Sequence, residues 1–300
     1  MKRKQSGFKI MMRLIKLVKP LAFFMVLAVI LGVTGFLCAI QITVVGSMTL
    51  LTAAGINGGL AIKTGCICII IFAVLRGFLH YGEQACNHYI AFKLLALIRD
   101  KVFKSLRRLA PAKLEGKDKG NLISLITSDI ELLEVFYAHT ISPVCIAFLT
   151  SLVMLIFIGR YSIWLMLIAL AAYITVGIII PLVSSKFNKN IGMTYRENSG
   201  SLSGYVLDSM RGLLESIRYN STDTRLNEMN EKTDELNSLQ KKLKKIEGHN
   251  ISITDISIIF FSITMLLVAI CLYQKGTIGF DGLIVSTVAM MSLSLIHISE

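Results

Sequence analysis

Six long apolar stretches constrain the fold of this chain more than any other feature of its sequence. A helix needs about 20 apolar residues to cross the hydrocarbon core of a bilayer. The chain is 54% hydrophobic with a mean hydropathy of +0.67, which is too apolar for a soluble domain of this length. We therefore expect an all-α membrane protein with six transmembrane helices. Their apolar cores lie near residues 21–46, 65–81, 136–158, 161–184, 256–273 and 282–298.

The positive charges are distributed unevenly among the connections. Of the 31 lysines and arginines, seven lie in residues 1–19, nine in residues 82–135 and eleven in residues 185–255, whereas the other three connections hold one each. Lysine and arginine accumulate on the cytoplasmic side of a membrane. This predicts a multi-pass protein of a bacterial cytoplasmic membrane, with its N-terminus and both long polar segments in the cytoplasm. Topology then explains the net charge of +12 without a nucleic-acid partner.

The segment before the first stretch, residues 1–19, has two possible roles. Its residues 8–18 place apolar side chains on one stripe and basic side chains mostly off it, which is typical of a helix lying in the membrane interface. A basic flank that only sets the topology would explain the same residues. Both interpretations leave residues 20–298 as the transmembrane domain, in contact with the lipid bilayer.

The two cytoplasmic segments are long enough to form helical hairpins. At 1.5 Å per residue, residues 82–135 give arms of roughly 35–40 Å and residues 185–255 give arms of roughly 50 Å. Pro111 and the glycines that follow it mark the break of the first hairpin. The returning arm of the second hairpin carries apolar residues at coiled-coil-like spacing. They are Leu226, Met229, Leu236, Leu239, Leu243 and Ile246.

Two stretches in these segments resemble a known family. One reads KGNLIS at residues 119–124, followed by TSDI at 127–130, and the other runs from Tyr195 to Tyr219. Together with the six spans and the loop lengths, they resemble the intracellular-loop motifs in the transmembrane domain of ATP-binding-cassette (ABC) exporters of the six-helix type. The second motif departs from the family at Asp208, where glutamate is usual, and near Tyr219, where phenylalanine is usual. Residues 8–135 look most like the half-transporters for cysteine or glutathione export.

The resemblance implies a domain-swapped dimer of identical or different halves, in which short coupling helices at the loop tips dock on nucleotide-binding domains. On this chain the tips are residues 111–128 and 209–220. Tyr219 is either an aromatic anchor of that interface or a residue that packs within the stalk. The residues that the resemblance assigns to coupling with the ATPase are Gly120, Asp129, Gly212, Ile217, Arg218 and Tyr219.

The sequence lacks the phosphate-binding pattern G-x-x-x-x-G-K-[ST] of many ATPases. Gly116-Lys117 has neither the upstream glycine nor the following serine or threonine. This chain is therefore not expected to be an enzyme by itself. ATP and magnesium are expected on a nucleotide-binding domain, in the same full-length chain or in a separate subunit. The last apolar stretch has only about 17 residues and no cytoplasmic flank, which favours a chain truncated at its C-terminus.

Polar residues in and beside the spans are the candidates for a substrate cavity, because ionisable groups are costly inside a membrane. Those on the second span fall within an arc of about 100°. An arginine at this depth suits an anionic group such as a carboxylate. Alternatively, Arg76 reaches the lipid headgroups, the other residues begin the stalk, and the glutamine on the first span forms an interhelical hydrogen bond. The candidates are Arg76, His80, Glu83, Gln84, Asn87 and Gln41.

The sequence favours the permease part of an ATP-driven exporter that moves a small molecule by alternating access. Two other classes remain open. A membrane sensor or scaffold would use residues 226–246 as a dimerising stalk, although the one histidine near this seam, His249, lies just past it. A secondary transporter would place charges at the membrane midplane, where only Arg76 comes close. No catalytic residue and no metal site is expected.

Overall fold

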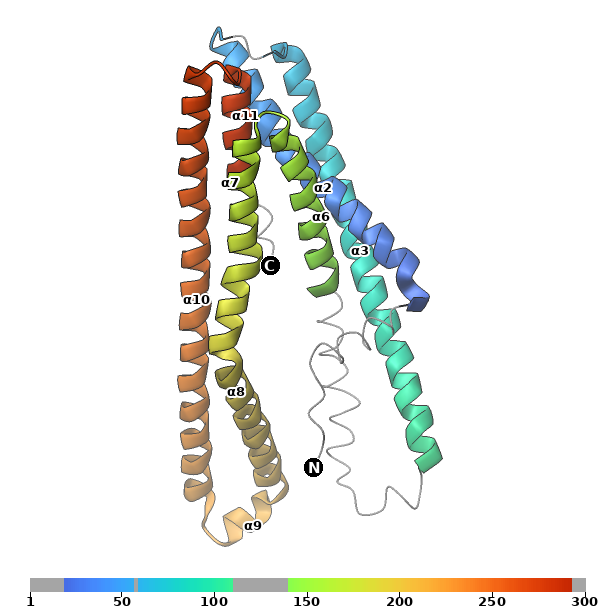
Figure 1. Ribbon diagram of the computed structural model, residues 1–300. Coiled ribbons are helices and arrows are strands. Elements are labelled where there is room, and N and C mark those ends of the chain that lie inside the picture. Colours follow the sequence, from blue (N-terminus) through green and yellow to red (C-terminus); the bar gives the residue numbers. More distant parts are fainter. Residues whose placement is uncertain (1–18, 57–58, 110–139, 293–300) are drawn as a thin grey trace. The chain divides into compact units, whose positions relative to one another are not determined.

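The helices of this chain account for every regular element that the structure describes. The computed structural model describes residues 19–56, 59–109 and 140–292, without the side chains of residues 109 and 187–189. Five helices in these ranges are long and apolar enough to cross a membrane (Figure 1). The expectation of an all-α membrane protein is therefore confirmed.

The described chain divides into two compact units. Among the described residues, the first unit comprises 19–56, 59–109, 140–166 and 266–292, and the second comprises 167–265. The predicted interfacial segment and the first loop tip, with Gly120 and Asp129, lie outside the described residues, apart from Lys19.

The first unit is built around one apolar helix, α2. The helices of this unit are α2 (Ala22–Ala53) after a short 3-10 turn (Lys19–Leu21), α3 (Ile62–Leu109), α6 (Ser142–Gly159) and α11 (Phe280–Met291). In this unit α2 packs against α3, α6 and α11. The last of these helices covers the start of the sixth predicted span, whose residues from 293 onward lie outside the described part.

Small residues allow this close packing. In α2 the buried positions include Ala28, Gly32, Gly35 and Ala39, whose small size lets neighbouring backbones approach closely. In lipid, where no hydrophobic effect drives helices together, such close packing contributes to their association. A Cβ on Gly65 of α3 would overlap the side chain of Thr49. Contact between α2 and α3 at this level therefore depends on glycine.

The face of α6 that packs inward follows the helical repeat. Its buried residues recur every four positions, as expected for one stripe of a helix against a neighbour. They are Ser142, Ile146, Thr150, Met154 and Ile158.

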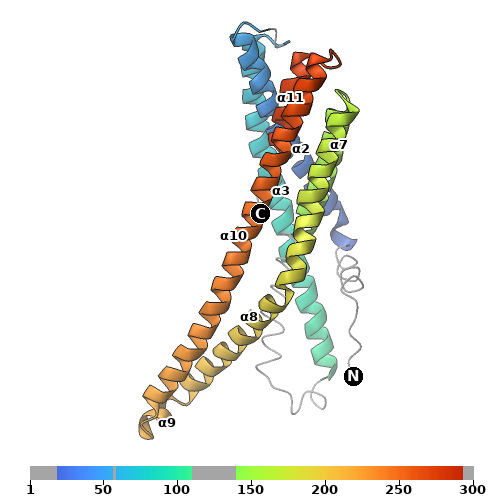
Figure 2. The same ribbon diagram turned by 60° about the vertical axis from the view of Figure 1, so that its left-hand side comes forward.

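The second unit contains a long helical hairpin (Figure 2). Its elements are α7 (Ile163–Ile174), a π-helical turn (Thr175–Ile179), α8 (Ile180–Arg211), α9 (Leu213–Arg218) and α10 (Thr222–Gln274). Of α7, only the residues from 167 onward belong to this unit, and of α10 only those up to 265. Pro181 has no backbone N–H to offer the carbonyl of Gly177, which explains why the helix widens into a π turn at this point.

Side-chain hydrogen bonds join the two arms of this hairpin. They pair Asn198 with Glu235, Tyr205 with Glu228, Ser209 with Arg225, and Ser184 with Asn250. In each of the four pairs, the two residues are equally far along the chain from residues 216–217. This is expected for two antiparallel helices that start from the same turn, because both rise by the same distance per residue. The hairpin therefore turns within α9.

Candidate functional site

The polar residues of α3 that the sequence groups together are separated by the fold. Glu83 and Asn87 are buried, with exposed fractions of 6% and 4%. Gln84 is half-buried, whereas Arg76 and His80 are exposed. On α2, the candidate Gln41 is also half-buried. The predicted stripe therefore crosses the edge of a helix interface: Glu83 and Asn87 lie inside the interface, whereas Arg76 and His80 lie outside it.

The carboxyl group of Glu83 occupies a space that a glycine leaves open. A Cβ at position 32 of α2 would lie 3.3 Å from Cδ of Glu83 and would overlap the side chain of Ile146 on α6. Three helices therefore meet at Gly32, and two of them place a side chain over its Cα. The sequence alone does not identify Glu83 and Ile146 as the neighbours of Gly32.

Glu83 also connects two other polar residues of its own helix. Its Oε2 lies 3.3 Å from Nδ1 of His80, and its Oε1 accepts a hydrogen bond from Nδ2 of Asn87 at 3.5 Å. Both contacts are long, so neither fully replaces the hydration of the carboxyl group. Within the described residues, Oδ1 of Asn87 is buried without a hydrogen-bond partner, as are the hydroxyls of Ser142 and Thr150 on α6.

This arrangement determines which ligand chemistry the buried cluster can bind. Glu83 and the free oxygen of Asn87 are hydrogen-bond acceptors, so the cluster suits a ligand group that donates hydrogen bonds or carries positive charge. The arginine that suggested an anionic ligand is exposed, and no ion pair joins it to Glu83 among the described residues.

The second candidate site is the tip of the long hairpin. Gly212 separates α8 from α9 and donates its N–H to the carbonyl of Asp208 at 2.9 Å. Ser216 is buried, and its hydroxyl donates to the carbonyl of Gly212 at 3.0 Å. Asn220 ends the tip with a positive φ of 49°, a conformation that asparagine tolerates better than most residues. These bonds give the short helix a defined start and end.

The outer surface of this tip is apolar. Leu214 and Tyr219 are 78% and 83% exposed, and Leu213 and Ile217 are exposed beside them. Arg218, also exposed, contributes the positive charge in the last turn of α9. An apolar patch with a charged rim is the composition of a protein-binding surface.

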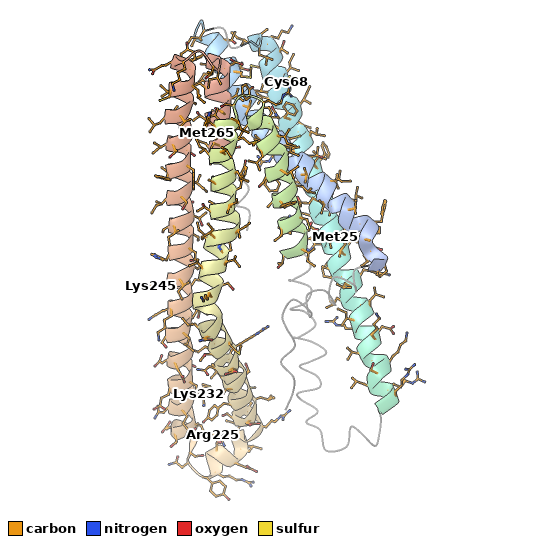
Figure 3. The ribbon with its side chains drawn as sticks, in the orientation of Figure 1. Met25, Cys68, Arg225, Lys232, Lys245 and Met265 are labelled. Carbon is orange, nitrogen blue, oxygen red and sulfur yellow. The ribbon has the colours of Figure 1, made fainter. Side chains whose placement is uncertain are left out.

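Below the tip, Tyr205 of α8 forms a cluster with α10. Its hydroxyl donates a 2.6 Å hydrogen bond to Oε2 of Glu228. Arg225 and Lys232 lie over its ring at 5.9 and 5.6 Å from the centroid, and both are labelled on α10 in Figure 3. The hydrogen bond to the Glu228 carboxylate is the main reason why the pKa of Tyr205 is raised above its ordinary value.

Sequence reasoning did not identify these cross-hairpin pairs. It placed the second tip at residues 209–220 and found the apolar seam of the returning arm, but it assigned no partner to the polar residues beside that seam. Reflecting the sequence about residues 216–217, in the second half of α9, would have found the partners, because the two residues of each pair are equally far from that point.

Comparison with known proteins adds three findings. Residues 21–296 match the family described as the ABC transporter transmembrane region. The chain is 42% identical over 289 residues to a Haemophilus influenzae protein named "Probable ABC transporter ATP-binding/permease protein", covering 96% of this chain and 52% of that protein. The chain therefore spans about half the length of this relative.

Two further relatives are more distant. The glutathione/L-cysteine transport system ATP-binding/permease protein CydC of Haemophilus influenzae is 23% identical over 59% of this chain and 31% of its own length. The ATP-dependent lipid A-core flippase of Shewanella denitrificans is 24% identical over 61% of this chain and 30% of its own length. The names of these two relatives indicate different cargoes.

Proposed function

Because this chain belongs to the family of ABC transporter transmembrane regions, we propose that it is the permease part of an ATP-driven exporter of a bacterial cytoplasmic membrane. The family assignment is an argument against the two alternatives, a membrane sensor and a secondary transporter. The proposal places the N-terminus and both hairpin tips in the cytoplasm, as the distribution of lysine and arginine predicts.

The observation that carries this proposal is the apolar surface of α9 at the end of two long helices. Leu214 and Tyr219 expose most of their side chains to no partner within the described chain. From this tip, α10 continues without interruption for 53 residues, about 80 Å at 1.5 Å per residue, into an apolar segment. A partner that moves the tip would therefore also move the membrane end of the same helix.

The partner in this proposal is a nucleotide-binding domain, encoded in the same full-length chain or in a separate subunit. ATP and magnesium would bind to that domain, because this sequence has no phosphate-binding pattern to hold them. The proposed coupling residues on this chain are Gly212, Ile217, Arg218 and Tyr219, with Gly120 and Asp129 on the other loop. A second transmembrane half, identical or different, would complete the dimer.

The hydrogen bonds between α8 and α10 support the transmission of movement. Asn198 donates to Glu235 at 2.9 Å, and Tyr205 donates to Glu228 at 2.6 Å. Because such pairs join the arms at several levels, a displacement of α9 is passed to both helices rather than bending one of them.

The proposed cargo contacts are the polar residues of α3 and α2 that are buried or half-buried where the helices of the first unit pack together. Glu83 and Asn87 form the centre of this group, and Gln84 and Gln41 extend it. Arg76 and His80 would contact cargo only where the second half of the dimer encloses them. A cargo with an amino group, as in cysteine or glutathione, meets the preference of the buried acceptors for a hydrogen-bond donor.

A labelling experiment on the full-length protein tests the position and partner of the tip. In a cysteine-depleted background, Tyr219→Cys is expected to react with an impermeant maleimide in inside-out vesicles but not in right-side-out vesicles. A short bifunctional thiol reagent is then expected to crosslink Tyr219→Cys to the nucleotide-binding domain.

Tyr195→Cys is the matched control, because it replaces a tyrosine on the same hairpin but far from α9. It is expected to show the same sidedness without the crosslink. Labelling of Tyr219→Cys only from the outside, or equal crosslinking of both variants, would contradict the proposal.

A further inference from the structure

A groove lies between α8 and α10 in the second unit. Its volume is about 810 Å³, and its wall is mostly aliphatic, with Ile179, Val183, Ile246 and Ile253 among the lining residues. Asn250 donates a hydrogen bond to Ser184 across the groove, so the two helices are joined at this level.

Two independent counts place this groove at the polar end of the membrane spans. About 20 helical residues cross the hydrocarbon core, so a span that begins at Ile163 ends near residue 183. Counting back from Gln274 at the end of α10 gives a boundary near residue 255. The lining residues fall between 179 and 184 on α8 and its preceding turn and between 245 and 253 on α10, so the groove extends from the edge of the hydrocarbon into the headgroup layer.

A lysine and a histidine lie together at the headgroup end of the groove. Lys245 and His249 both line it, and they are four residues apart on one face of α10. Lys245 supplies a positive charge, and the ring of His249 supplies a hydrogen-bonding group. In Figure 3, Lys245 lies farther from the tip than Arg225 and Lys232. Lysine side chains place their aliphatic part on apolar surface and their ammonium group among the headgroups.

Neighbouring charges do not neutralise this end. Lys245 is the last of four lysines in residues 241–245. The acidic residue nearest in sequence, Glu247, pairs with Lys244 at 2.8 Å rather than with Lys245. The next acidic residue along the helix, Asp255, is not among the residues that line the groove.

We propose that this groove binds an anionic phospholipid of the leaflet at this end of the spans. The phosphate contacts Lys245 and His249, and an acyl chain lies along the wall formed by Val183 and Ile253. Basic pockets between transmembrane helices on the cytoplasmic side suit anionic headgroups. The aliphatic wall requires a lipid rather than a soluble anion, because a free phosphate would leave most of the groove uncovered.

Such a lipid would stabilise the hairpin of α8 and α10 at the end where it enters the membrane. Ser184 and Asn250 supply the hydrogen bond that joins α8 and α10 at this level, and the bound lipid would add contacts to both helices beside it. Binding only to the folded hairpin raises its stability by mass action.

Native mass spectrometry of the full-length protein in mild detergent tests the site directly. Titration with phosphatidylglycerol is expected to give a saturable adduct, several times more abundant than that with phosphatidylcholine of the same chains. Lys245→Glu is expected to weaken phosphatidylglycerol binding by more than about fivefold, because the loss of one basic residue near an anionic headgroup accounts for about that factor and the glutamate adds a negative charge. Glycerol 3-phosphate, which has no acyl chain, is expected not to bind.

Two variants separate the groove from general attraction to the lysine run. Lys242→Glu makes the same charge change outside the groove and is expected to leave the adduct unchanged. Val183→Trp fills the apolar wall and is expected to lower binding of both lipids without changing the charge. Equal binding of the two lipids by the wild-type protein would overturn the proposal. Equal weakening by Lys242→Glu and Lys245→Glu, or binding of glycerol 3-phosphate at the groove, would also overturn it.

Discussion

Gly32 shows how a single residue determines the chemistry of a membrane site. With no side chain of its own, it leaves room for the carboxyl group of Glu83 and the side chain of Ile146. A buried carboxyl group is costly in a membrane and marks a functional position by default. Its neighbours His80 and Asn87 reduce that cost through hydrogen bonds, while Oδ1 of Asn87, which has no partner among the described residues, retains capacity for a ligand.

Replacing Gly32 with valine tests this packing. The new side chain would overlap Ile146 and press on Glu83, so we expect a loss of about 1–3 kcal/mol in the free energy of unfolding, typical of overpacked cores. Thermal unfolding of the detergent-purified protein measures it. Gly77→Val is the control, because nothing lies within 4 Å of a Cβ at that position. Equal stability of the two variants would show that the three helices do not meet at Gly32.

The amino-acid sequence could predict that Glu83 and Asn87 lie on one helix but not which of their neighbours are buried. An arc of about 100° on a helix is wider than one interface, so it includes residues on both sides of the interface edge. Only the position of α2 relative to α3 decides that Glu83 lies inside and Arg76 outside. That position depends on small residues such as Gly32 and Gly65, whose partners are far away in the sequence.

At the scale of elements, the hairpin of α8 and α10 combines an apolar seam with polar pairs. Half-buried residues such as Leu236 and Leu243 follow the coiled-coil-like spacing, which could be predicted. Tyr205 and Glu228 could not be paired from that spacing, because apolar periodicity identifies a face of a helix but not its register against a partner. The register becomes clear only when the turn is fixed at α9.

The Tyr205–Glu228 hydrogen bond predicts a pH dependence of the hairpin. The protonated phenol is the donor, and its pKa is raised chiefly by this bond. The stabilisation is therefore complete below the ordinary tyrosine pKa of about 10 and is lost as the pH rises through the raised value. Limited proteolysis is expected to cut Tyr205→Phe faster than wild type at pH 8, with the difference disappearing at higher pH.

Tyr195→Phe provides the comparison, since it removes a hydroxyl from the same helix. It is expected to be cut at the wild-type rate at every pH. A difference between Tyr205→Phe and wild type that persists unchanged above the raised pKa would mean that the hydrogen bond to Glu228 does not hold the arms together.

For the whole molecule, the central claim is that movement of an ATPase reaches the membrane spans through α9. Gly212 and Tyr219 carry this claim on the described part of the chain. The N–H of Gly212 donates to Asp208, so proline at this position would remove the bond that joins α8 to α9. Alanine at position 219 would remove the most exposed aromatic side chain of the tip. Both changes leave the spans themselves intact.

The most direct measurement is the ATP-driven change in distance between two spin labels, one at Lys63 in the first turn of α3 and one at Lys275 in the connection that follows α10. It needs no knowledge of the cargo. In the full-length protein trapped with ATP and vanadate, we predict a shifted distance distribution for the wild type and for the control Tyr195→Ala. Gly212→Pro and Tyr219→Ala are predicted to hydrolyse ATP while the distribution stays that of the nucleotide-free protein. A full wild-type shift in both variants would contradict the account.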